Sequence, residues 1–147
     1  ALLPKWFREF PGVEWIVISG QKLPVLDDKY RVTLDVKGKR LTGSAPELAA
    51  YELLSAVPGT LSFNHAAELF QGLVNLNPRK VEYLLSVSQS VQTKRLYLFF
   101  ASFYEHGWLR RIDSQKIDLG AGKRQIVVNG KFNAQYQITV PERFQKE

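Results

Sequence analysis

Residues 44–107 constrain the fold most, because apolar residues recur there at the three- and four-residue spacing of amphipathic helices. Pro58-Gly59 interrupts the first segment, and Pro78 can open another because its missing N–H is harmless in a first turn. We therefore expect four successive helices, joined by short loops into a compact layer or bundle. The expected starts are Ser44, Ser62 or Asn64, Pro78 and Thr93, and Gly107 is expected to end the last helix.

The first of these helices carries a capping-box pattern. Ser44 precedes Glu47 by three residues, the spacing at which each side chain reaches the other residue's backbone N–H. Pro46 lies between them, early in the helix, where proline is tolerated. The pattern predicts that Ser44 caps the helix with Glu47.

Strand patterns precede the helical stretch. Residues 13–18 form a short apolar run rich in β-branched and aromatic residues. Residues 31–36 alternate between polar and apolar types, which places Val32, Leu34 and Val36 on one face of a strand. Residues 37–39 then read as a hairpin turn.

Strand patterns also follow the helices. Asn129-Gly130, a pair typical of tight turns, separates residues 125–128 from residues 135–140, which predicts a hairpin. Strands, then helices, then strands predict an α+β fold, with a mixed α/β fold as the variant, in one domain over residues 1–147. We expect the strands at both ends to form a sheet with about four helices packed on it.

Composition excludes several classes of protein. The 147 residues include no cysteine, which rules out disulfides and thiolate chemistry and fits a cytoplasmic location. The longest apolar run, residues 96–101, is too short to cross a bilayer, and no secretory signal opens the chain. Methionine is also absent, so we expect Ala1 to be a processed start or a cut inside a longer protein.

Positive charge is concentrated in the second half of the chain. Residues 41–78 contain three acidic residues and no lysine or arginine, whereas residues 79–131 contain ten basic residues and four acidic ones. A basic surface attracts polyanions regardless of their sequence, although the same charges also suit a solvated face. The basic residues recur as the doublets Arg79-Lys80, Lys94-Arg95, Arg110-Arg111 and Lys123-Arg124.

The common catalytic patterns are absent. His65 and His106 lie on different expected helices, without cysteines to complete a zinc site, so no metal is expected. The sequence has no G-x-S-x-G elbow of a serine hydrolase. Residues 118–124 include two glycines and a lysine, but Arg124 stands where a phosphate loop needs serine or threonine. We interpret this segment as a glycine-rich turn that presents two cations to solvent or to a phosphate backbone.

A metal-dependent nuclease of the restriction type is an alternative. Such an enzyme needs carboxylates that converge on Mg²⁺ and a lysine that positions the attacking water. Asp35 and Lys37 have the acid-x-lysine form at a strand end, and Asp27 and Asp28 lie upstream. This hypothesis requires Asp27 or Asp28 to meet Asp35 and Lys37 in one cleft.

Several segments of the chain match the pattern of one known family in order. The matching segments are Leu3-Pro4-x-Trp6-Phe7, Ser44-x-Pro46-Glu47-x-Ala49, Glu52-Leu53-Leu54, Ala67-Glu68-Leu69-x-x-Gly72-Leu73, Ser90-Val91-x-x-Lys94-Arg95-Leu96, Ile117-Asp118-Leu119-Gly120-x-Gly122-Lys123-Arg124-x-Ile126-Val127 and Tyr136-x-Ile138-Thr139-Val140-Pro141. Together they resemble the C-terminal portion of the AbiEi antitoxins of type IV toxin–antitoxin systems. The resemblance covers nearly all of this chain, and residues 117–127 are its most specific part.

The resemblance implies a regulatory role without catalysis. Family members carry an N-terminal winged helix-turn-helix that binds their promoter, and we expect that domain to lie outside this chain. The C-terminal portion is associated with neutralising an AbiEii toxin, a nucleotidyltransferase-like protein, without a stable complex, and no cofactor is implied. A domain that dimerises a repressor is a further alternative.

These observations define a set of expected functional residues. The family-motif residues are Ser44, Pro46, Glu47, Asp118, Gly120 and Gly122, and the expected nucleic-acid or partner surface comprises Lys94, Arg95, Arg110, Arg111, Lys123 and Arg124. The polyanion would be operator DNA or an RNA shared with the toxin.

Overall fold

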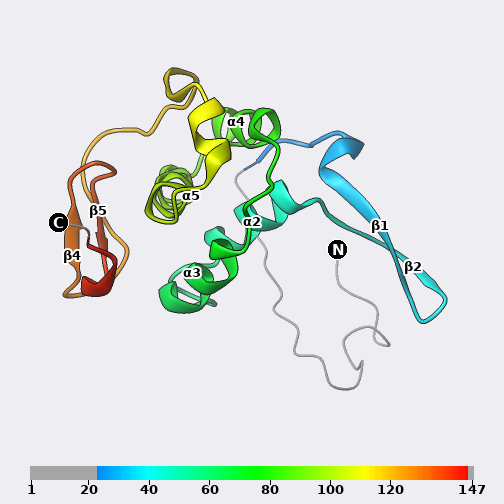
Figure 1. Cartoon of the computed structure of the whole chain (residues 1–147), viewed down its shortest axis with the longest axis horizontal. Helices are drawn as coiled ribbons and strands as arrows, with labels where there is room; N and C mark the ends of the chain where they lie inside the picture. Colours follow the sequence, from blue (N-terminus) through cyan, green and yellow to red (C-terminus); the bar gives the residue numbers. More distant parts are fainter. Residues whose placement is uncertain (1–22, 146–147) are drawn as a thin grey trace.

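The structure is a computed structural model that describes residues 23–145. Helices occupy the middle of the molecule in Figure 1, the β1–β2 hairpin projects on one side, and β4 and β5 lie on the other side. This arrangement confirms the α+β class. The strands form two separate small sheets, however, where one sheet was expected. The α-helices are α2 (Pro46–Ser55), α3 (Phe63–Gln71), α4 (Pro78–Val87) and α5 (Val91–Phe103).

Side-chain caps fix where three of these helices begin. Ser62 accepts a hydrogen bond from the N–H of His65 at the start of α3, as predicted. Asn77 caps α4, whose first residue is Pro78, also as predicted. Ser90 caps α5 by accepting from the N–H of Thr93, so this helix begins two residues before the expected start.

Two predicted helix ends are wrong. The N-cap of α2 is Ala45, which has no side-chain cap, because Ser44 belongs to strand β2. The capping box at Ser44 and Glu47 therefore does not form. Helix α5 ends at Phe103, and Gly107 instead begins a 3-10 helix, η2 (Gly107–Arg111). Glu105 between them has a φ of +55°, a left-handed conformation that stops an α-helix.

The first hairpin is confirmed by the structure. Strands β1 (Arg31–Val36) and β2 (Lys39–Ser44) pair antiparallel, and Lys37 and Gly38 at the turn both have positive φ. A short 3-10 helix, η1 (Asp28–Tyr30), leads into β1. The side chains of Leu34 and Val36 and the predicted strand at residues 13–18 lie outside what the structure describes.

The second hairpin forms with a different turn from the one predicted. Strand β4 (Lys131–Asn133) pairs antiparallel with β5 (Ile138–Val140), so the turn lies between Asn133 and Ile138. The short strand β3 (Arg124–Gln125) pairs in parallel with β5. Asn129 has positive φ, but a Cβ on Gly130 would lie 2.7 Å from the carbonyl oxygen of Val140. The Asn-Gly pair therefore lets the chain pass close to β5 before β4 begins.

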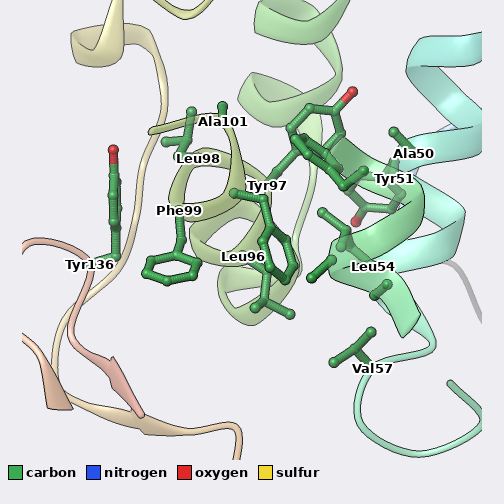
Figure 2. Close-up of a cluster of buried hydrophobic side chains, with 14 of the residues drawn as sticks. Ala50, Tyr51, Leu54, Val57, Leu96, Tyr97, Leu98, Phe99, Ala101 and Tyr136 are labelled. Carbon is green, nitrogen blue, oxygen red and sulfur yellow. The ribbon is translucent and has the colours of Figure 1, made fainter. Parts of the chain in front are cut away.

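Helix α5 is the centre of the hydrophobic core. In Figure 2, Leu96, Tyr97 and Phe99 of α5 lie between α2 and Tyr136 from the turn between β4 and β5. Phe100 of α5 is fully buried against Phe63 and Phe70 of α3. Burial of this much aromatic surface stabilises a helix whose N-terminal turns carry two cations.

Within residues 23–145, none of the helices is both long enough and apolar enough to span a membrane.

Candidate nucleic-acid interface

The first family motif joins three helices. The Glu47 side chain is buried and its carboxylate accepts a hydrogen bond of 2.8 Å from the N–H of Asn77, the cap of α4. The Glu47 carbonyl accepts a hydrogen bond of 3.0 Å from the hydroxyl of Tyr97 on α5. Burial, and next the Glu47 charge, raise the pKa of Tyr97, so this hydroxyl remains a donor. Ser44 donates to Glu52 and Pro46 opens α2. These residues hold the fold together.

The Lys94-Arg95 doublet does not lie on an exposed surface, contrary to expectation. The two residues are only 4% and 3% exposed. Lys94 Nζ donates to the carbonyl of Asp118 at 2.6 Å. Arg95 donates from Nε to the Leu119 carbonyl at 2.9 Å, and from one terminal nitrogen to the carbonyls of Gly122 at 2.6 Å and Gln137 at 3.3 Å. Both cations are buried because a neighbouring loop supplies carbonyl acceptors.

That loop is the most specific family segment, and we call residues 118–124 the 118–124 loop. The Asp118 carboxylate accepts a hydrogen bond from the N–H of Gly120 at 2.8 Å. Gly120 and Gly122 have φ of +67° and +82°, a region that favours glycine. A Cβ on Gly120 would lie 2.9 Å from a methyl group of Val91 in the first turn of α5. The glycines therefore allow the loop to lie directly on α5.

Two further cations sit at the end of this loop. Lys123 is exposed, and its ammonium lies 5.0 Å from the ring centre of Phe132 on β4. Arg124 is half-buried and donates to the carbonyls of Ala121 and Lys123 at 3.3 Å each. Burial, and then the nearby Arg124 charge, lower the pKa of Arg95. Lys94 and Arg95 thus support the 118–124 loop, and the Lys123-Arg124 doublet forms its charged end.

The Arg110-Arg111 doublet lies elsewhere. Both side chains are exposed at the end of η2 and line an open pocket of about 570 Å³. Trp108, buried and bonded through its indole N–H to the Leu73 carbonyl, lies in the wall of this pocket with Pro78. Within residues 23–145, no hydrogen bond or ion pair joins this doublet to the 118–124 loop. Of the six residues expected on the surface, Lys94 and Arg95 are therefore buried supports of the loop. The other four form two separate cationic positions, one at each remaining doublet.

The nuclease residues do not meet. Asp27 caps η1 and pairs with Lys29, whereas Asp35 lies opposite Arg40 within the projecting hairpin. Within residues 23–145, no group of three or more acidic, histidine or cysteine side chains is placed to hold a metal ion. The geometry therefore gives no support to a convergent Mg²⁺ site.

His106 is buried, bonds the Phe70 carbonyl at 3.1 Å and stacks on Trp108.

One group of residues beside the 118–124 loop, residues 135–137, was not among the candidate residues predicted from the sequence. Gln135, Tyr136 and Gln137 line an open pocket of about 270 Å³ together with Arg95 and residues 119–122. They escaped notice because the predicted hairpin placed residues 135–137 inside a strand. The positive φ of Gln137, +54°, marks the actual turn. The pairing of β4 with β5 forms this turn, and a hydrogen bond of 2.9 Å from the N–H of Arg124 to the Gln137 carbonyl joins it to the loop.

Comparison with known proteins agrees with these local features. A profile of the family described as "Transcriptional regulator, AbiEi antitoxin, Type IV TA system" matches residues 1–141. Neither the curated proteins nor the solved structures include a match to the chain. Because the match covers almost the whole chain, this protein belongs to the AbiEi antitoxin family of type IV toxin–antitoxin systems.

Proposed function

We propose that this chain is the antitoxin effector domain of a bacterial regulator and counteracts a nucleotidyltransferase-like toxin from the cytoplasm. It does so without a stable toxin complex, by binding a nucleic acid, either operator DNA or an RNA that the toxin uses. The contact surface comprises Lys123 and Arg124 of the 118–124 loop and the Arg110-Arg111 doublet. A winged helix-turn-helix domain elsewhere in the protein provides the main promoter contact.

One observation carries the proposal: Lys94 and Arg95 are buried as supports of a loop whose exposed end is cationic. Burying charged side chains has a large desolvation cost, which a loop that merely connects two elements does not require. The supported loop presents Lys123 and Arg124 in a fixed position. Fixed cations suit phosphate contacts, because less side-chain entropy is lost on binding.

A rescue assay tests the antitoxin role. The chain is expressed with its cognate toxin, as the unchanged protein and as the variants Lys123→Ala/Arg124→Ala and Arg110→Ala/Arg111→Ala. We expect the unchanged chain to restore growth and the loop variant to lose most of the rescue. The variant Lys116→Ala is the matched control, because Lys116 is an exposed cation that already pairs with Glu82. Failure of the unchanged chain to restore growth contradicts the effector role.

Binding measurements test the nucleic-acid contact separately. Short DNA and RNA duplexes and single strands are titrated with each variant over a range of salt concentrations. Each lost phosphate contact lowers the slope of log affinity against log salt by about one. We expect the Lys123→Ala/Arg124→Ala variant to lower this slope by about two, and Lys116→Ala to leave it unchanged. Equal slopes for all variants contradict the proposed surface.

A further inference from the structure

Most carbonyl groups of the 118–124 loop are engaged by cationic side chains, either of α5 or of the loop itself. Carbonyls of the loop accept hydrogen bonds from three cationic side chains: Lys94 bonds residue 118, Arg95 bonds residues 119 and 122, and Arg124 bonds residues 121 and 123. The N–H of Gly120 bonds the Asp118 carboxylate. The N–H groups of residues 121–123 have no hydrogen-bond acceptor within the part of the chain that the structure describes. Consecutive free amides beside residues of positive φ are the arrangement of an anion-binding nest.

The charges around this loop are not balanced. Lys94, Arg95 and Arg124 are in contact with its backbone, and Lys123 projects from it. No carboxylate within residues 23–145 forms an ion pair with any of these four. Carbonyl groups satisfy the hydrogen-bond donors but leave the net positive charge in place. A bound anion would therefore gain more at this point than at an ordinary exposed lysine.

A pocket of suitable lining lies on the same loop. Its lining consists of Arg95, residues 119–122 and the turn residues Gln135, Tyr136 and Gln137. The two glutamines are exposed and have amide groups that can donate hydrogen bonds. The pocket volume of about 270 Å³ is larger than one phosphate group needs, so a phosphate can enter with part of its bearer.

We propose that this pocket is a phosphate-binding subsite. The free amides of the 118–124 loop and the side-chain amides of Gln135 and Gln137 hold the phosphate oxygens. The buried Arg95, which lines the pocket, contributes its charge, and Lys123 adds a second positive charge from the same loop. The inference rests on the proposed function, because it gives the nucleic-acid contact a defined place for one phosphate. Free phosphate or a mononucleotide shares the same chemistry.

The test uses the full chain and a charge change at the rim. Gln135→Glu places a carboxylate beside the pocket and also removes the 3.3 Å hydrogen bond that Gln135 Nε2 donates to the Tyr136 hydroxyl. Gln71→Glu, at the exposed end of α3, makes the same charge change elsewhere. Inorganic phosphate is titrated by ³¹P NMR line broadening and by its effect on Tm, at fixed ionic strength set with chloride. We expect one site, weakened about tenfold by Gln135→Glu (about 1.4 kcal/mol) and within about twofold in Gln71→Glu.

Competition with RNA distinguishes the two phosphate sources. A short single-stranded RNA without a terminal phosphate should displace inorganic phosphate if the site serves a phosphodiester. Phosphate binding that RNA does not displace, but that Gln135→Glu still weakens, assigns the subsite to free phosphate or a mononucleotide. Absence of phosphate binding, or equal binding by both variants, overturns the subsite. If growth rescue persists in that case, only the subsite fails and the proposed function stands.

Discussion

The doublets Lys94-Arg95 and Arg110-Arg111 have nearly the same composition and opposite environments. The first is buried and donates only to backbone carbonyls, whereas the second is exposed beside an open pocket. Their positions differ as well: the first lies in the N-terminal turns of α5, and the second ends a 3-10 helix. Cations are unfavourable near the N-terminus of a helix because of the helix dipole. The loop carbonyls offset this unfavourable interaction with the helix dipole, because they accept hydrogen bonds from Lys94 and Arg95.

The comparison shows that a basic doublet in the sequence does not by itself indicate an exposed surface, because nearby backbone carbonyls can bind the two cations in the interior. Gly120, in left-handed conformation, lets the 118–124 loop approach Val91 of α5 closely, and the carbonyls of residues 118, 119 and 122 bond Lys94 and Arg95. Arg95 then links the loop to the turn before β5 through Gln137. The guanidinium has several donors in a fixed plane, which suits it to join separate backbone segments.

The largest expected effect is that of Arg95→Ala. This change removes the donors for three carbonyl oxygens and leaves a cavity under the loop. We expect the free energy of unfolding to fall by about 3 kcal/mol, since each lost hydrogen bond contributes about 1 kcal/mol. Urea unfolding followed by tryptophan fluorescence measures the change.

Arg110→Ala is the matched control for that substitution. An exposed arginine contributes little to stability, so we expect a change within about 0.5 kcal/mol. Similar losses for the two alanine variants would show that the buried and exposed doublets are energetically alike, which would break the comparison.

The second effect in size is that of Gly120→Ala. Alanine at a φ of +67° is strained, and its Cβ would lie 2.9 Å from a Val91 methyl group. We expect a loss of about 2 kcal/mol, of which about half returns when Val91→Ala removes the overlap. Gly72→Ala is the control, because the nearest atom to its Cβ is 3.8 Å away and its φ is not positive. Thermal unfolding of Gly120→Ala, Val91→Ala, their double variant and Gly72→Ala separates the cost of backbone strain from the cost of overlap. No loss of stability in Gly120→Ala would show that the loop does not need to lie on α5.

Local patterns predicted the elements of this fold but not how distant segments meet. The spacing of apolar residues, the cap at Ser62 and the proline in the first turn at Pro78 identified helices, because those signals lie within a few residues. The β4–β5 pairing was missed, because Asn129-Gly130 serves a close approach to Val140. Burial of Lys94 and Arg95 was missed for the same kind of reason, since their acceptors lie more than twenty residues away.

The smallest expected effect is that of Lys94→Met, which tests whether the two buried cations contribute equally. Lys94 makes one hydrogen bond, to a carbonyl of the exposed residue Asp118, and water can replace that donor. Methionine keeps most of the buried chain and avoids the cost of desolvating a charge, so we expect a change in the free energy of unfolding within about 1 kcal/mol. Arg95→Met provides the paired measurement and should lose at least twice as much, because its carbonyl partners lie on two segments. Equal losses for both methionine variants would mean that the charge itself, rather than the number of carbonyls bonded, holds the loop on α5.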